Sequence, residues 1–216
     1  MRSPQSVPAL EQLGRVQLSK SFFMREFLYS EIAQIHGLPN IPEDPDLAIE
    51  VGRKLCEEVL EPIQGALGRI TIRSAYRSPA VNALGNERGY NCASNEKNYT
   101  RHIWDRLDAH GQRGATATVV VTRVVPYYEA TADWQALAWW IHDHVPSYAD
   151  MVFFPKLAAF NISWHERPTK TISSYVDPKG VLTRPGLPNH AGSHQSHYAP
   201  LLQWLADPSL PTDGEG

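Results

Sequence analysis

Residues 70–82 read ITIRSAYRSPAVN, and this stretch decides how the chain is expected to fold. From Arg69 to Arg73, charged or polar residues alternate with β-branched ones, a pattern that predicts a short strand. Ser78 followed by Pro79 predicts the start of a small helix, which we expect to end at Gly85. The stretch therefore predicts a strand that leads through a short connection into a helix.

Helices are expected before this strand. A first helix is predicted from Ser21 to Gly37, with apolar residues on one face and glycine at its end. A second is predicted to open at Asp44-Pro45 and to run to Leu67, because its apolar residues recur every four positions. Pro62 should kink this helix near its end, since proline lacks the N–H that the helix needs there.

Strands dominate the second half. Strands are predicted at 115–125, 151–154, 158–164 and 173–176, and a tryptophan-rich helix at 131–144. The predicted strands and helices do not alternate as repeated βαβ units. The order of elements favours an α+β fold, with helices packed on one face of a small antiparallel sheet. We expect a single domain at 18–206, a lead-in at 1–17 and a disordered tail at 207–216.

Composition narrows the functional class. The chain has 216 residues with 20 Lys and Arg against 23 Asp and Glu, a net charge of −3. This near balance gives no net positive electrostatic potential to attract nucleic acid and no basic patch to bind an anionic membrane. The N-terminus lacks the apolar stretch of a signal peptide, and no run reaches membrane-spanning length, so a cytoplasmic protein is expected. Cys56 and Cys92 are the only cysteines, too few for a disulfide framework or a thiolate metal site.

Two histidines carry the strongest chemical signal. His102 ends a long polar loop, residues 86–101, and is followed by Asp105 and Asp108. His165 closes an apolar strand directly after Trp164. Imidazole and carboxylate are both good zinc ligands, so the two histidines are candidate metal ligands. A chain of this length buries enough surface to fold without a metal, and a bound metal would therefore serve chemistry.

The run from Leu18 to Val125, with Trp164-His165 further on, resembles the M15 family of zinc peptidases. That family includes D-Ala-D-Ala carboxypeptidases and phage-type murein endopeptidases, and the Tyr-Arg-Ser-Pro stretch at 76–79 is the most specific part of the likeness. The resemblance implies the hedgehog-like zinc peptidase scaffold. It makes His102 the first metal ligand and His165 the last. It also makes Arg77 the arginine that binds the substrate, a role for which a guanidinium is suited because it pairs with carboxylates bidentately.

The chain departs from the family pattern at the second metal ligand. The family has an aspartate seven residues after the first histidine, where this chain has Ala109. If an insertion shifts the match, the position holds Thr118 instead. The second ligand then comes from Asp105 or Asp108. Asp105 could share one side of a helical turn with His102, whereas residues 108–111 are typical of a turn in which aspartate bonds its own backbone. We prefer Asp105.

A second departure affects the general base. The family has a glutamate three residues before the last histidine, and this chain has Ile162, which cannot accept a proton. Glu166 could take the role if the strand ends at His165, and so could Asp108, Glu129 or a histidine. Glu166 and Asp108 are the catalytic candidates.

The sequence therefore predicts a metal-dependent hydrolase, with Zn²⁺ as the expected cofactor, acting on a peptide or amide bond. A cell-wall target follows from the resemblance alone. One alternative is a repurposed enzyme with a two-histidine, one-carboxylate Fe(II) centre, and another is a metal-free binding module. The expected partner is a peptide-like or small-molecule substrate, with neither nucleic acid nor membrane, and the oligomeric state is left open.

The remaining histidines have weaker signals. His142 and His144 end the tryptophan-rich helix, where they are expected to cap its C-terminus. His190, His194 and His197 lie in a Gly- and Ser-containing stretch that we expect to be a polar loop, of the kind that often contacts substrate.

Overall fold

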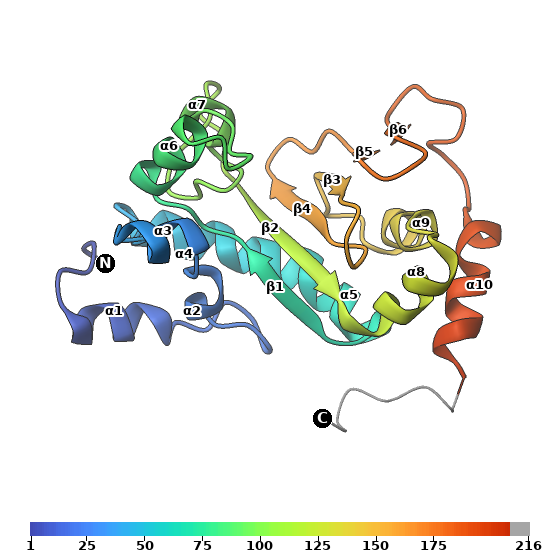
Figure 1. Cartoon of the computed structure of the whole chain (residues 1–216), viewed down its shortest axis with the longest axis horizontal. Coiled ribbons are helices and arrows are strands. Elements are labelled where there is room, and N and C mark those ends of the chain that lie inside the picture. Colours follow the sequence, from blue (N-terminus) through green and yellow to red (C-terminus); the bar gives the residue numbers. More distant parts are fainter. Residues whose placement is uncertain (208–216) are drawn as a thin grey trace.

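The computed structural model describes residues 1–207 and contains one six-stranded sheet flanked by helices. The strand order is β1-β2-β4-β3-β5-β6. The strands are β1 Ile70–Ser74, β2 Gly114–Val121, β3 Asp150–Phe153, β4 Phe160–His165, β5 Thr171–Ser174 and β6 Gly180–Thr183. The main helices are α1 Val7–Gly14, α2 Met24–Phe27, α3 Glu31–His36, α4 Pro45–Leu55, α5 Glu61–Leu67, α6 Pro79–Glu87, α7 Asn95–Asn98, α8 Val125–Thr131, α9 Gln135–His144 and α10 Gln195–Leu205. In Figure 1, α6 and α7 lie at one end of the molecule, and α9 and α10 lie at the other.

The expectation of mixed helices and strands in an α+β arrangement is confirmed, but the sheet is not wholly antiparallel. β5 runs parallel to β3, with Met151 opposite Ile172. β6, which the sequence did not predict, extends the sheet beyond β5. It is short and half of it is exposed, so it lacks the apolar alternation that makes a strand visible in sequence.

The long helical run from Pro45 to Leu67 forms as predicted. It contains one π-helical turn, Cys56–Leu60, between α4 and α5. This wider turn ends at Leu60, two residues before Pro62. In an ordinary α-helix, proline lacks the N–H that would bond four residues back, and its ring clashes with the carbonyl there. The run stays continuous across the proline.

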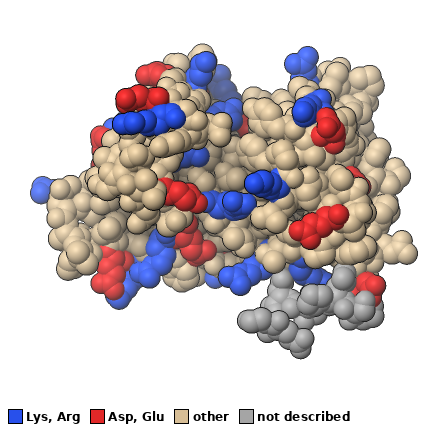
Figure 2. Space-filling model, in the orientation of Figure 1, with Lys and Arg blue, Asp and Glu red and all other residues tan. Residues whose placement is uncertain are grey.

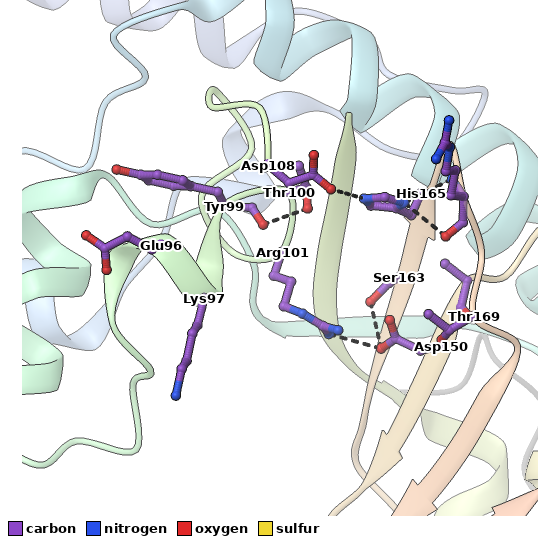
Figure 3. A pocket seen from close by; sticks show the side chains of 12 residues that line it. Glu96, Lys97, Tyr99, Thr100, Arg101, Asp108, Asp150, Ser163, His165 and Thr169 are labelled. Carbon is purple, nitrogen blue, oxygen red and sulfur yellow. Dashed lines mark hydrogen bonds and ion pairs between the residues drawn. The ribbon is translucent and has the colours of Figure 1, made fainter. Parts of the chain in front are cut away.

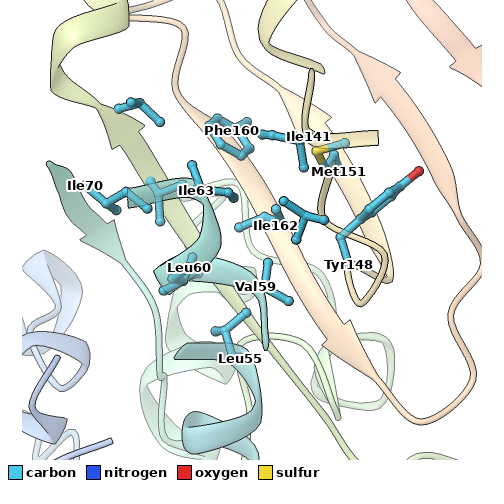
Figure 4. Packing of buried hydrophobic residues seen from close by; sticks show 14 of the residues in the cluster. Leu55, Val59, Leu60, Ile63, Ile70, Ile141, Tyr148, Met151, Phe160 and Ile162 are labelled. Carbon is cyan, nitrogen blue, oxygen red and sulfur yellow. The ribbon is translucent and has the colours of Figure 1, made fainter. Parts of the chain in front are cut away.

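The core lies between this helical run and one face of the sheet. Figure 4 shows Leu55, Val59 and Ile63 against Phe160 and Ile162 of β4, and all five side chains are fully buried. Because side chains alternate along a strand, the other face of β2 and β4 carries the intervening residues. These are polar: Thr116 and Thr118 on β2, with Asn161 and Ser163 on β4.

The N-terminal part differs from the prediction over residues 21–37. The helix expected over 21–37 is divided into two: α2 ends at Phe27, and α3 begins after Ser30, whose Oγ accepts the amide of Ala33. The lead-in at 1–17 contains α1, which packs beside α2. Of the tail predicted to be disordered, residues 208–216 lie outside the described residues.

Between residues 1 and 207, no helix combines the length and the apolar character that crossing a bilayer requires.

Candidate functional site

Two cavities open on the polar face of the sheet, at opposite ends of one row of paired residues. Gly114 lies opposite His165, Thr116 opposite Ser163, and Thr118 opposite Asn161. The last two pairs are joined through their side chains, with Oγ1 of Thr116 at 2.7 Å from Oγ of Ser163 and Oγ1 of Thr118 at 2.6 Å from Oδ1 of Asn161. Figure 2 shows this side of the molecule hollowed between two lobes.

The first hollow, called here the His165 cavity, has a volume of about 270 Å³. Its lining includes Thr100, Arg101, Asp108, Asp150, Ser163, His165 and Thr169. Asp150 is the centre of a polar network, accepting from Arg101 at 3.2 Å and from Ser163 at 3.2 Å (Figure 3). The cavity therefore presents hydroxyls and paired charges of both signs.

His165 and Asp108 meet at this cavity. Nε2 of His165 lies 3.4 Å from Oδ2 of Asp108, and Nδ1 accepts the amide of Arg167 at 3.0 Å. Nδ1 also lies 3.1 Å from the carbonyl oxygen of Arg167, so contacts at both ring nitrogens fix the orientation of the imidazole. Asp108 Oδ1 accepts the backbone amides of Gln112 and His110, and these bonds hold the pKa of the carboxyl below its usual value. Asp108 is therefore a turn residue that stays ionised and is a weak proton acceptor.

Gly114 brings the loop around Thr100 into contact with His165. A Cβ atom at Gly114 would lie 2.6 Å from the carbonyl oxygen of Thr100 and 2.7 Å from Cδ2 of His165. No side chain fits in that space. The glycine thus allows the imidazole of His165 to lie across the start of β2.

His102 is buried on a different part of the site. Its Nδ1 donates to the carbonyl oxygen of Ala75 at 2.7 Å, and its own carbonyl accepts the amide of Arg77 at 2.7 Å. Burial lowers the pKa of His102 to about 3, so the ring is neutral at physiological pH. In this tautomer Nε2 is the unprotonated nitrogen.

Asp105 faces the chain segment that precedes α4. Its Oδ2 accepts the amides of Glu43 at 2.7 Å and Asp44 at 3.4 Å. Among the described residues, neither its buried Oδ1 nor the buried hydroxyl of Tyr76 has a partner at hydrogen-bond geometry, although the charge of Asp105 acts on that hydroxyl. Burial raises the pKa of the Asp105 carboxyl and also that of the Tyr76 hydroxyl. Asp105 therefore organises the entry to α4.

The candidates for the general base lie apart from one another. Glu166 binds Arg113, accepting its backbone amide at 2.8 Å and its Nε at 2.8 Å, and these bonds lower the pKa of the glutamate. Glu129 is exposed on α8. Ile162, at the family's glutamate position, is fully buried in the core. Of the two catalytic candidates, Asp108 lines the His165 cavity and Glu166 is held by an arginine.

The predicted metal ligands are not brought together. Within residues 1–207, no three His, Cys, Asp or Glu side chains are grouped so that they could hold a metal ion. His165 has Asp108 beside it, whereas His102 and Asp105 contact other segments. This donor arrangement does not fit a three-ligand centre as it stands, and the metal remains a prediction.

The second hollow, called here the Arg77 cavity, has a volume of about 630 Å³. Its lining includes Ser30, Glu31, Ile32, Arg73, Ser74, Arg77, Thr118, Phe154, Pro155 and Lys156. Half-buried Arg77 donates to Oγ of Ser74 at 3.3 Å and to Sγ of Cys92 at 3.4 Å. In the described part of the chain no carboxylate lies within ion-pair distance of this guanidinium, and burial lowers its pKa.

Several residues of these cavities were not identified from sequence. Thr118 was considered only as a substitute for a ligand, yet it lines the Arg77 cavity. Alternation along residues 114–121 was the available signal, because it places Thr116 and Thr118 on the face opposite Ala117 and Val119. Arg73 and Lys156 gave no signal, since exposed basic residues are common.

The remaining histidines line neither cavity. Of the two histidines expected to cap α9, only His144 contacts a carbonyl of that helix, with Nδ1 at 2.9 Å from the carbonyl oxygen of Trp140. The prediction is wrong for His142, which contacts the hydroxyl of Tyr148 at 2.6 Å and the carbonyl oxygen of His190 at 2.9 Å. His194 binds Asp143 at 2.6 Å and stacks on Trp139 with 4.0 Å between the ring centroids. The stretch that contains His190 and His194 is thus fastened to α9, away from both cavities.

No protein-family model matches this chain, and no curated protein or solved structure is significantly similar to it.

Proposed function

We propose that the polar face of the sheet is a binding cleft for a peptide-like or small molecule, whose carboxylate is bound by Arg77. The observation that carries the proposal is the guanidinium of Arg77, which lies half-buried at a cavity of about 630 Å³ with neutral partners only. The proposal keeps the substrate-binding role expected for Arg77 from the resemblance to M15 peptidases.

The chemistry of the arginine favours a carboxylate. Bonds to Ser74 and Cys92 fix the guanidinium without pairing its charge, and Glu31 acts on that charge only from beyond ion-pair distance. A partly desolvated charge gains more from a bound counter-ion than an exposed one does, because water screens it less. The planar fork of arginine matches the two oxygens of a carboxylate, so the ligand would gain orientation as well as energy.

Calorimetric titration of the full chain with D-Ala-D-Ala and with its C-terminal amide tests the proposal. The acid should bind, and the amide should bind at least about tenfold more weakly, because a charge-assisted pair contributes about 1.5–3 kcal/mol. Arg77→Gln should abolish the difference, whereas Arg88→Gln, an exposed control outside the cavity, should retain it. Equal binding of acid and amide by the unmodified protein would overturn the proposal.

Metal-dependent hydrolysis of a peptide or amide bond is the second candidate function. Two observations favour it: His102 donates from Nδ1 to a carbonyl, an arrangement common in metal-binding histidines, and His165 lies beside Asp108 at a cavity. Binding of Zn²⁺ would require donors that now lie apart to come together. A cell-wall substrate for this activity rests on the resemblance alone.

Elemental analysis of the purified protein, with His102→Ala and His165→Ala as controls, decides between the metal-dependent alternatives. Zinc at one per chain, lost in both variants, supports the hydrolase. Iron accompanied by dioxygen consumption supports the Fe(II) alternative. Absence of metal after loading with either ion leaves binding as the function.

A further inference from the structure

The charges around the Arg77 cavity are unbalanced. Three cationic side chains line it, Arg73, Arg77 and Lys156, against one carboxylate, Glu31. None of the three cations makes an ion pair within the described residues. By contrast, Arg101, Arg106 and Arg113 each bind a carboxylate. The cavity therefore has an excess of about two positive charges.

A strand irregularity places two of the polar groups. Arg73 and Ser74 are consecutive, and on a regular strand their side chains would face opposite sides of the sheet. The pairing of β1 with β2 shifts register between Ile72 and Ser74, so that Ser74 lies opposite Thr118. Such a bulge redirects side chains, and here both Arg73 and Ser74 line the cavity.

The third cation comes from the connection between β3 and β4. The amide of Ala159 donates to the carbonyl of Lys156 at 3.0 Å, which closes this turn and places exposed Lys156 at the cavity. Its neighbours Phe154 and Pro155 line the same cavity, with Ile32 of α3. Figure 2 shows basic side chains near the middle of the hollowed face. The cavity thus combines cations with an apolar wall.

We infer that the Arg77 cavity selects an organic ligand with two negative charges close together, one bound by Arg77 and the other facing Arg73 and Lys156. The inference rests on the proposed carboxylate-binding function of Arg77 and adds the class of ligand, a dicarboxylate or an acidic peptide end. The apolar wall of Ile32, Phe154 and Pro155 favours an organic dianion over inorganic phosphate, which has no apolar surface to bury.

Two ligands of nearly equal shape measure what the second negative charge of the ligand contributes to binding. N-acetylglutamate and N-acetylglutamine have almost the same shape, but only the first carries a second carboxylate. Calorimetric titration of the full chain should show N-acetylglutamate binding about fivefold more tightly or better, the effect expected from two exposed cations. Raising the salt concentration should reduce this ratio, because both cations are exposed to solvent.

Three variants test the assignment. Arg73→Gln with Lys156→Gln should bring the ratio of affinities close to one. Arg53→Gln with Arg88→Gln removes the same net charge from exposed positions outside the cavity and should leave the ratio unchanged. Glu31→Gln removes the single carboxylate of the lining and should raise the ratio. All substituted side chains in these variants are exposed, and circular dichroism verifies their folding.

The outcomes separate this inference from the proposed function. If both ligands bind equally and in an Arg77-dependent manner, the dianion inference fails and the proposed function stands. If neither they nor D-Ala-D-Ala bind, both fail. Inorganic phosphate that competes as strongly as N-acetylglutamate would show that the apolar wall contributes nothing, and would overturn the organic part of the inference.

Discussion

The backbone of His102 holds Arg77: the amide of Arg77 donates to the carbonyl of His102 at 2.7 Å. The imidazole of the same histidine donates to the carbonyl of Ala75, two residues before Arg77, also at 2.7 Å. The residue expected to bind metal therefore fastens the segment that carries the proposed ligand-binding arginine. A change at His102 should affect both stability and ligand binding.

His102→Ala should lower the free energy of unfolding by about 2–4 kcal/mol, because it leaves the Ala75 carbonyl unpaired and opens a cavity. Ligand affinity at Arg77 should fall as well. His102→Asn can offer an amide N–H near the position of Nδ1 and should recover part of both losses. Urea unfolding and the D-Ala-D-Ala titration measure the two effects, and an unchanged affinity in His102→Ala would contradict the positioning role.

The protein should lose stability in mild acid because of His102. Its pKa is about 3 when folded and about 6.5 when unfolded, so between these values the unfolded chain binds one more proton. Stability then falls as pH decreases from about 6.5, by about 1.4 kcal/mol for each pH unit. Burial lowers the pKa of His142 too, which adds loss in the same direction.

Urea unfolding at several pH values between 7.5 and 5 measures this slope. His102→Asn removes the titrating ring, so the free energy of unfolding of this variant should fall by about 1.4 kcal/mol less for each pH unit than that of the unmodified protein. Equal slopes would show that His102 does not contribute.

Asp105→Asn should leave the protein as stable at pH 7 or make it more stable. The amide keeps an oxygen for the backbone amide of Glu43 and removes a buried charge whose burial raises the pKa of Asp105. Asp105→Ala should instead cost about 1–3 kcal/mol, since the amides of Glu43 and Asp44 lose their acceptor. Thermal unfolding compares the two, and strong destabilisation by asparagine would mean that the negative charge itself is required.

Gly114→Ala should destabilise the protein by about 1–3 kcal/mol, because its Cβ would meet Thr100 and His165 at under 3 Å. The displaced imidazole should show altered NMR chemical shifts. Gly65→Ala on α5 is the control: a Cβ there meets nothing within 4 Å, so it should stabilise the helix by up to about 1 kcal/mol. Equal effects of the two substitutions would contradict the close packing at Gly114.

Sequence patterns predicted what depends on local periodicity. The helical run to Leu67, the strand at residue 70 and the strand that ends at His165 all have side chains that repeat with the period of their element. The polar alternation of β2 and β4 likewise follows from a period of two. These features were predictable because neighbours in sequence determine them.

Only the tertiary structure decided what each candidate side chain contacts. His102 and Asp105 are three residues apart, yet one binds Ala75 and the other binds Glu43. The parallel pairing of β3 with β5 and the meeting of Arg73, Arg77 and Lys156 also join distant segments. The physical reason is that periodicity records which face of an element is buried, whereas a site depends on which segment packs against that face.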